Sequence, residues 1–241
     1  MLKLKDQKLL VVAPHPDDEV LGCGGLIKKI KQAGGNVSVL YLTVGDTQDY
    51  SASGKSTSSQ RISEIKKVAK FLDFDDWEIA LEGNDYHLQL DKVPQLKLIS
   101  IIDKYIAKLT PTILATTQSY DYNQDHIACA KAVAAATRPA PLEDRYIPNI
   151  IMGYHSVVTA GWAQIQVPNP NFYLQLNKHD LAAKAQALGL YTSQVRENGH
   201  QRTPEAVEKI ARVWGMHAGT EYAESYFIHK FFTPIVSGGK D

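Results

Sequence analysis

Short apolar runs alternate with segments of helical hydrophobic spacing along the first half of the chain. The predicted strands are short, apolar and rich in Val, Ile and Leu, at 8–14, 36–44, 77–82 and 112–117. Apolar positions at helical spacing predict helices between and after them, near 20–33, 59–72, 94–108 and 125–137. Several strands are apolar at consecutive positions, which is typical of strands buried on both faces of a mostly parallel sheet.

The C-terminal third mixes strand and helix patterns less regularly. Further apolar runs lie at 149–155, 165–167 and 171–176, two helical patterns near 178–189 and 204–217, and a last strand pattern near 226–232. We therefore expect an α/β fold: a Rossmann-like, doubly wound, mostly parallel sheet with helices on both faces and a C-terminal α+β extension. The low-complexity polar stretch at 45–60 follows a strand end and suits a mobile loop.

Composition narrows the class of protein. The 241 residues, 44% of them hydrophobic, are enough for one sizeable core, and we expect a single domain over 1–241. Lys plus Arg and Asp plus Glu both number 26, so charge gives no argument for nucleic acid or a membrane surface as partner. Two cysteines are too few for a disulfide framework, and no long apolar segment begins the chain. These features indicate a cytoplasmic protein without a membrane span.

The candidate chemistry begins with the stretch VVAPHPDDEVLGCGG at 11–25. It places His15, Asp17 and Asp18 at the end of a predicted strand, where open parallel sheets bind ligands. A helix N-cap would account for one of the acids, but not for the histidine beside two carboxylates. Imidazole and carboxylate suit zinc, whose catalytic sites use about three protein ligands. His15 and Asp18 supply two, and His126, which follows the strand near 112–117, offers a third.

The sequence resembles the LmbE-like, or PIG-L, family of zinc-dependent N-deacetylases. The resemblance rests on HPDDE (15–19), RISE (61–64), the pair Asp125 and His126, KAQALGLYTSQ (184–194) and AESYF (223–227), in this order along the chain. HPDDE after an apolar strand is a specific motif, whereas RISE, TSQ and AESYF count only together. What the resemblance implies is a hydrolase that removes an N-acetyl or other N-acyl group from an amino-sugar conjugate such as one of N-acetylglucosamine. It also implies that the chain can form a homo-oligomer.

The resemblance further implies that one Zn²⁺ per chain is bound by His15, Asp18 and His126, while Asp17 is the general base. This division is chemically reasonable, because a carboxylate next to a metal-binding aspartate can accept the proton of a metal-activated water and pass it to the departing amine. Many relatives have His-x-Asp-His at the second motif, where this chain has Asn123. A neutral amide cannot carry a proton, so the proton transfers fall to Asp17.

Other residues have weaker assignments. Asp125 is a candidate to orient a metal-binding imidazole, with a solvated acid at a helix N-terminus as the alternative. Arg61 and Glu64 are either a modest surface pair on one helix or residues near the site, where Arg61 could brace the PHPDDE loop or reach the substrate. His155 ends an apolar strand and could line the pocket. Surface or core roles are the expectation for the remaining histidines, His87, His179, His200, His217 and His229.

Two alternatives to an amide hydrolase remain open at this stage. A nucleotide-binding Rossmann enzyme is disfavoured, because Ile27 stands where the third glycine of the fingerprint belongs and the glycines follow an acid cluster. A metal-dependent sugar-binding module without catalysis would keep the zinc ligands but would not need Asp17. Acetate release from N-acetylated amino sugars separates this module from an enzyme.

Overall fold

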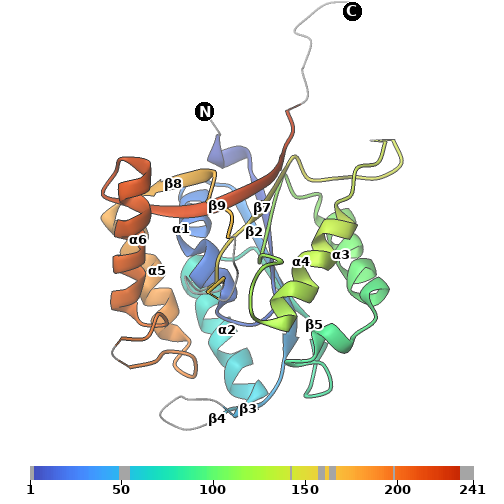
Figure 1. The fold of residues 1–241 in the computed structure, drawn as a ribbon, viewed down its shortest axis with the longest axis horizontal. Helices are drawn as coiled ribbons and strands as arrows, with labels where there is room; N and C mark the ends of the chain where they lie inside the picture. Colours follow the sequence, from blue (N-terminus) through green and yellow to red (C-terminus); the bar gives the residue numbers. More distant parts are fainter. Residues whose placement is uncertain are drawn as a thin grey trace, which may run out of the picture.

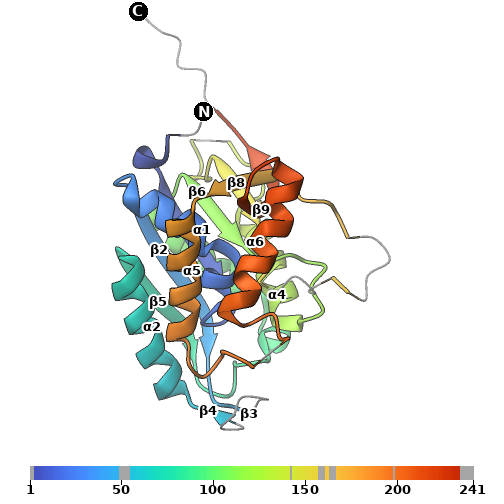
Figure 2. The ribbon, with the colours of Figure 1, turned by 90° about the vertical axis from the view of Figure 1, so that its left-hand side faces the viewer.

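The computed structural model describes residues 3–48, 55–141, 143–156, 161–162, 167–197 and 199–233. In this part of the chain a seven-stranded sheet lies between two layers of helices (Figures 1 and 2). Helices α1, α2, α5 and α6 cover one face of the sheet, and α3 and α4 cover the other (Figure 1). The expected doubly wound α/β fold is confirmed.

The main sheet has the strand order β5-β2-β1-β6-β7-β9-β8. Its strands are β1 (Lys8–Ala13), β2 (Asn36–Val44), β5 (Asp76–Glu82), β6 (Ile113–Thr116), β7 (Ile150–Gly153), β8 (Phe172–Leu176) and β9 (Tyr222–Phe231). The first five in space are parallel, whereas β9 runs antiparallel to β7 and to β8. The chain order therefore reverses between β1 and β6, which is the topological switch point at which open α/β sheets bind ligands.

The helices begin and end close to the predicted positions. They are α1 (Asp18–Gln32), α2 (Ser58–Leu72), α3 (Gln95–Leu109), α4 (Gln124–Ala136), α5 (Lys178–Leu190) and α6 (Pro204–Ala218), with short 3₁₀ turns η1 (Leu4–Asp6) and η2 (Leu90–Lys92). Side chains cap several N-termini: Thr57 on α2, Asn177 on α5 and Thr203 on α6 accept backbone N–H groups. None of the helices in the described ranges is long and apolar enough to cross a membrane.

Alternation along β1 divides the core between the two faces of the sheet. Leu9 and Val11 point into the core under α1, α2, α5 and α6, whereas Leu10 and Val12 point into the core under α3 and α4. All four side chains are buried, as expected for a strand covered on both faces. This double burial explains why β1 is apolar at consecutive positions, and it fixes the strand whose end carries the HPDDE motif.

Three C-terminal and loop features differ from the sequence prediction or fall outside the described residues. Strand β9 starts at Tyr222, four residues before the predicted start at 226, because buried Glu224 belongs to the strand although it is charged. The polar stretch at 45–60 contains a two-residue ribbon, β3 (Thr47–Gln48) with β4 (Lys55–Ser56), on either side of residues that are not described. The predicted run at 165–167 lies largely outside the described residues.

Candidate metal centre and active site

The loop between β1 and α1 holds its acids in an unusual backbone conformation. Asp17 occupies the N-cap position of α1 with φ 102° and ψ −27°, a left-handed conformation that is costly for a residue other than glycine. Its side chain makes no capping hydrogen bond, and its backbone N–H donates to Oε2 of Glu19 at 3.1 Å. The N-cap alternative therefore does not explain the Asp17 carboxylate, because this side chain does not cap α1.

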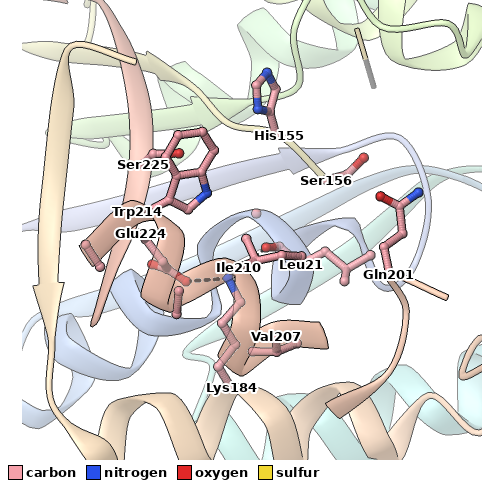
Figure 3. Close-up of a pocket in the computed structure, with 13 residues that line it drawn as sticks. Leu21, His155, Ser156, Lys184, Gln201, Val207, Ile210, Trp214, Glu224 and Ser225 are labelled. Carbon is pink, nitrogen blue, oxygen red and sulfur yellow. Dashed lines mark hydrogen bonds and ion pairs between the residues drawn. The ribbon is translucent and has the colours of Figure 1, made fainter. Parts of the chain in front are cut away.

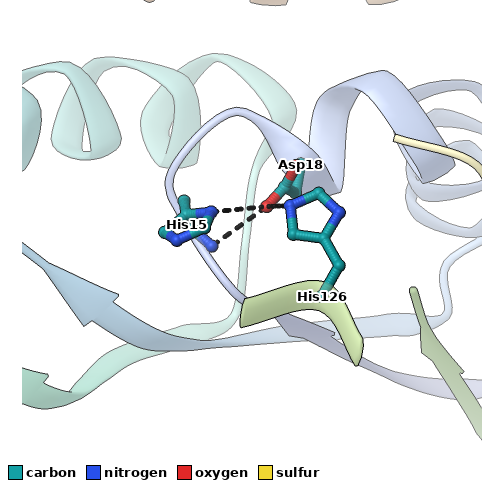
Figure 4. A group of neighbouring side chains, drawn as sticks. All are labelled: His15, Asp18 and His126. Atoms are coloured by element: carbon teal, nitrogen blue, oxygen red, sulfur yellow. Dashed lines mark hydrogen bonds and ion pairs between the residues drawn. The ribbon is translucent and has the colours of Figure 1, made fainter. Parts of the chain in front are cut away.

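His15, Asp18 and His126 form a compact group of metal-binding side chains (Figure 4). One donor atom of each lies within 4.8 Å of the others, and all three residues are buried. Asp18 Oδ2 lies 3.4 Å from both His15 Nδ1 and His126 Nε2. Asp18 Oδ1 and His126 Nε2 are buried without a hydrogen-bond partner. Two imidazole nitrogens and a carboxylate, with two of their donor atoms unpaired, are a ligand set that fits a divalent metal ion.

In both imidazoles one ring nitrogen faces Asp18, the inner nitrogen, and the other, the outer nitrogen, contacts a further carboxylate. His15 Nε2 lies 2.9 Å from Oδ2 of Asp125, and His126 Nδ1 lies 2.7 Å from Oδ2 of Asp121. A carboxylate accepts, so each outer nitrogen carries the proton and the inner nitrogen is left free to bind a cation. Asp125 in turn accepts the backbone N–H of Leu90 at 2.9 Å. The structure thus places Asp125 against a candidate ligand, in the position expected for an orienting residue.

Asn123 ties the second motif together through its backbone and side chain. Its side-chain oxygen accepts the N–H of Asp125 at 2.9 Å and caps α4, while its own N–H donates to Oδ1 of Asp121 at 2.9 Å. The carbonyl of this amide is therefore engaged in shaping the loop. The asparagine at this position helps to fix the two carboxylates that orient the imidazoles.

Burial acts to raise the pKa values of Asp17 and Asp18, and nearby positive charges act to lower them. Burial raises the pKa of Asp17, against the opposing effect of Arg202, whose Nε lies 3.6 Å from Asp17 Oδ2. Burial also acts to raise the pKa of Asp18, but the two histidines outweigh it and hold this pKa well below its usual range. Burial alone would lower the pKa of His126, yet Asp18 and Asp121 raise it to about 10. A proton on His126 Nε2 would therefore have to leave before this nitrogen could bind a metal ion.

Arg61 and Glu64 are both buried and do not pair with each other, so the surface-pair alternative is wrong. Arg61 Nη2 donates to the carbonyl of Pro16 at 3.1 Å, which braces the loop that carries the two aspartates. Glu64 instead accepts the backbone N–H and the hydroxyl of Ser193, at 2.9 and 2.6 Å. The RISE and TSQ motifs thus contact each other.

A chain of hydrogen bonds leads from Glu64 towards Asp17. The Ser193 hydroxyl donates to Glu64 and accepts Nε2 of Gln194 at 3.1 Å. Gln194 Oε1 accepts Nη1 of Arg202 at 3.3 Å, and Arg202 lies beside Asp17. The segment after α5 therefore delivers a guanidinium to the carboxylate that follows β1.

The start of the 184–194 motif and the AESYF motif form a second buried contact, which holds α1. Lys184 Nζ lies 2.7 Å from Oε1 of Glu224 and donates to the carbonyl of Leu21 at 2.8 Å. Glu224 accepts the N–H groups of Gly25 and Leu26, at 2.7 and 2.8 Å. A Cβ at Gly25 would lie 2.9 Å from the Glu224 carboxylate, so glycine permits this close approach.

Sequence reasoning missed Asp121, Arg202 and His87 as residues of the site. His87 is 5% exposed, its ring centroid lies 5.3 Å from that of His15, and its Nε2 accepts Nη1 of Arg61 at 3.2 Å. It follows β5, so a third parallel strand end delivers a side chain to the same edge of the sheet. The position of His87 after a strand could have indicated this, as could the acid five residues before His126. Arg202 lies in an irregular segment, for which the sequence contains no such signal.

His155 lies beside the metal cluster rather than in it. Its Nε2 lies 2.6 Å from the hydroxyl of Tyr120, and with Ser156 it lines a separate cavity (Figure 3). Ser156 connects the two regions, because its hydroxyl lies 3.4 Å from His126 Nδ1. Of the other histidines, His179 is exposed and lies outside both regions.

Comparisons with known proteins agree with this geometry. The family model for PIG-L, described as GlcNAc-PI de-N-acetylase, matches residues 10–137. Diacetylchitobiose deacetylase of Thermococcus kodakarensis is 27% identical over 225 residues, covering 90% of this chain and 81% of that protein. A probable N-acetyl-alpha-D-glucosaminyl L-malate deacetylase of Bacillus subtilis is 26% identical over 146 residues, 58% of this chain and 64% of that protein.

A solved structure shares the fold over nearly the whole length. A conserved protein of Thermus thermophilus superposes with a TM-score of 0.71 and 25% sequence identity, covering 98% of this chain and all of the other. The matched family region contains the HPDDE loop, Arg61, Glu64 and the Asp125–His126 pair, whereas Arg202 and the Lys184–Glu224 contact lie beyond it. This chain belongs to the PIG-L family, whose LmbE-like fold and HPDDE motif it carries.

Proposed function

We propose that this protein is a zinc-dependent hydrolase that removes the N-acetyl group from a conjugate of N-acetylglucosamine. The observation that carries the proposal is the buried group of His15, Asp18 and His126, with unpaired donor atoms, directly beside the Asp17 carboxylate. The group lies at the switch point of the sheet, at which open α/β sheets bind ligands. A structural ion pair would have no need of a second buried carboxylate whose residue has a strained backbone.

His15, Asp18 and His126 would hold the zinc ion, and Asp125 and Asp121 would keep their rings in the binding orientation. A bound zinc ion supplies Lewis-acid chemistry to water and to the amide carbonyl. Three protein ligands are the usual number in catalytic zinc sites, which keep a further position open. The donor set is therefore that of a catalytic rather than a closed structural site.

Asp17 moves the proton in this scheme. Its buried Oδ2 has no hydrogen-bond partner, with Arg202 Nε 3.6 Å away as an ion-pair partner, and this oxygen would accept a proton from the attacking water. The carbon–oxygen bond to the acetyl carbon then forms, the carbon–nitrogen bond breaks, and Asp17 returns the proton to the departing amine. Acetate and a free amino sugar are the products. Arg202 keeps a positive charge beside Asp17 and favours its ionised form before the reaction.

The substrate class follows from the named relatives together with the site. Their names describe de-N-acetylation of GlcNAc-PI, diacetylchitobiose and a glucosaminyl malate, which share N-acetylglucosamine joined to a second unit. The second motif of this chain has no second histidine, so proton transfer at the amide nitrogen stays with Asp17. We infer an enzyme for the same amide bond in a conjugate of this type.

The test compares metal-free and zinc-loaded protein on N,N′-diacetylchitobiose, N-acetylglucosaminyl malate and GlcNAc-PI, measuring acetate and free amine. The zinc-loaded protein should release both in equal amounts from at least one conjugate, and the metal-free protein should release neither. His126→Ala should lose zinc and activity, whereas the exposed His179→Ala serves as matched control. Binding of these sugars by zinc-loaded protein without acetate release would instead show a sugar-binding module.

A further inference from the structure

A cavity of about 50 Å³ lies between α1, α6 and β9, next to the metal cluster (Figure 3). Its walls are largely apolar: Leu21 of α1 faces Val207, Ile210, Ala211 and Trp214 of α6. Figure 3 shows Leu21, Ile210 and Trp214 close together, with Lys184 reaching up to Glu224. The cavity is thus lined by one face of α6, a helix that lies outside the region matched by the family model.

The charged groups of the cavity are paired within the protein, whereas His155 Nδ1 is buried without a hydrogen-bond partner. Lys184 and Glu224 are paired with each other, and Lys184 also donates to the carbonyl of Leu21. At the rim, burial lowers the pKa of His155 to about 4, so this ring is neutral at pH 7. No lone charge therefore faces the cavity from these residues. Such a lining favours a small apolar group over an ion or a sugar hydroxyl.

Three separate segments connect the cavity to the catalytic residues. The Leu21 N–H donates to the Asp17 carbonyl at 2.9 Å, which places Leu21 one turn further along the same face of α1, a rise of about 6 Å. Ser156 lines the cavity and contacts His126 Nδ1. Gln201 lines it as well and directly precedes Arg202, the partner of Asp17.

We propose that this cavity receives the acyl tail of the substrate and that the α6 wall sets the longest acyl group that the enzyme removes. The proposal rests on the proposed function, because it concerns the amide that Asp17 and the metal cluster would cleave. The carbonyl carbon bound at the cluster directs its substituent along α1 towards Leu21. A cavity of about 150 Å³ binds benzene, which is about 25 Å³ per carbon, so 50 Å³ accommodates roughly two to three carbon-sized groups.

This size has a consequence for the substrate range. The single methyl of an acetyl group leaves most of the cavity empty, whereas the tails of propionyl and butyryl groups fill more of it and bury more apolar surface. The zinc-loaded enzyme should therefore hydrolyse N-propionyl and N-butyryl amino sugars with kcat/KM within about tenfold of the N-acetyl compound. A hexanoyl tail exceeds the cavity and should be cleaved at least about tenfold less well.

The test uses N-acetyl, N-propionyl, N-butyryl and N-hexanoyl derivatives of chitobiose and of glucosaminyl malate, with released amine as readout. Ala211→Leu fills the cavity, so the ratio of kcat/KM for N-butyryl over N-acetyl should fall about 10- to 200-fold, the effect of one methylene in an apolar pocket. Ala218→Leu, at the exposed end of the same helix, is the matched control and should leave the ratio unchanged. Val207→Ala enlarges the cavity and should raise kcat/KM for the N-hexanoyl compound about tenfold.

The outcomes separate this inference from the proposed function. Acetate release with an acyl-length profile that neither Ala211→Leu nor Val207→Ala alters would overturn the acyl cavity and leave the deacetylase intact. If Ala211→Leu does not fold, Val207→Ala alone decides, and an unchanged N-hexanoyl rate overturns the inference. If the wild-type protein releases neither acetate nor amine from any compound, the proposed function fails, and the acyl cavity with it.

Discussion

Replacing Glu64 with alanine should strongly destabilise the protein. This is not expected from the sequence alone, in which Glu64 and Arg61 could form a modest pair on the surface of one helix. Glu64 is 1% exposed and accepts two donors from Ser193, the backbone N–H at 2.9 Å and the hydroxyl at 2.6 Å. It also accepts the hydroxyl of Thr192, at 2.7 Å, but that residue is exposed and can bond to water instead. Alanine would leave the two buried Ser193 donors without a charged acceptor.

Each buried donor that loses its partner costs about 1–3 kcal/mol, so the loss of two partners in Glu64→Ala should lower the free energy of unfolding by about 2–6 kcal/mol. At about 2–4 °C per kcal/mol for a chain of this size, Tm should fall by roughly 4–24 °C. Urea unfolding followed by circular dichroism measures the free energy, and calorimetry measures Tm. Because Ser193 leads through Gln194 to Arg202, kcat should also fall at a temperature where the variant is folded.

Glu208→Ala provides the matched control on α6. Glu208 pairs with Arg212 at 2.9 Å, but both side chains are about half exposed, and such surface pairs contribute at most about 1 kcal/mol. A loss below about 1 kcal/mol for Glu64→Ala, equal to that of Glu208→Ala, would refute the role given to the Glu64 contacts.

Three further variants test other parts of the structure. Asp121→Ala should weaken zinc binding about 10- to 100-fold, because His126 loses the carboxylate that orients it; unchanged affinity in a metal titration would contradict this. Lys184→Met should lower the free energy of unfolding by about 3–5 kcal/mol, because Glu224 stays buried without its cation. The same urea assay measures this loss, and a loss below about 0.5 kcal/mol would exclude a structural role for the pair. Burial lowers the pKa of His87 to about 3, so the unfolded state binds a proton below pH 6.5 that the folded state does not, and stability falls with pH down to about 3. His87→Asn should reduce this slope by up to about 1.4 kcal/mol per pH unit, and an equal slope in urea titrations across pH would contradict the assignment.

Much of the fold is predictable because the local pattern of apolar and polar residues indicates most strands and helices. Strands such as β1 are apolar at consecutive positions since both faces are covered, and the helices that follow them carry one apolar face. The start of β9 is not predictable in this way. Glu224 interrupts the apolar pattern, and its burial is made favourable by partners distant in the sequence, the ammonium of Lys184 and the N–H groups of Gly25 and Leu26.

The candidate site likewise contains residues that local sequence patterns predict and residues that only the fold brings together. His15, Asp18 and His126 could be grouped from the sequence, because they follow strands whose carboxyl ends share one edge of the sheet. Arg202 could not, because its contact depends on the path of an irregular segment that hydrophobic spacing does not encode. Arg61 and Glu64 share one helix, and only the fold shows that they serve different segments.

Asp17 gives the most direct test of the central claim, that this chain hydrolyses an amide with a carboxylate beside a bound metal ion. The measurement is kcat for acetate release together with zinc content, in one preparation of Asp17→Asn and one of wild type. The amide side chain is isosteric and Asp17 is not among the three grouped ligands, so zinc content should stay near one per chain while kcat falls about 10²- to 10⁴-fold. Near-normal turnover would contradict the mechanism, and loss of zinc would show that Asp17, rather than Asp18, binds the metal.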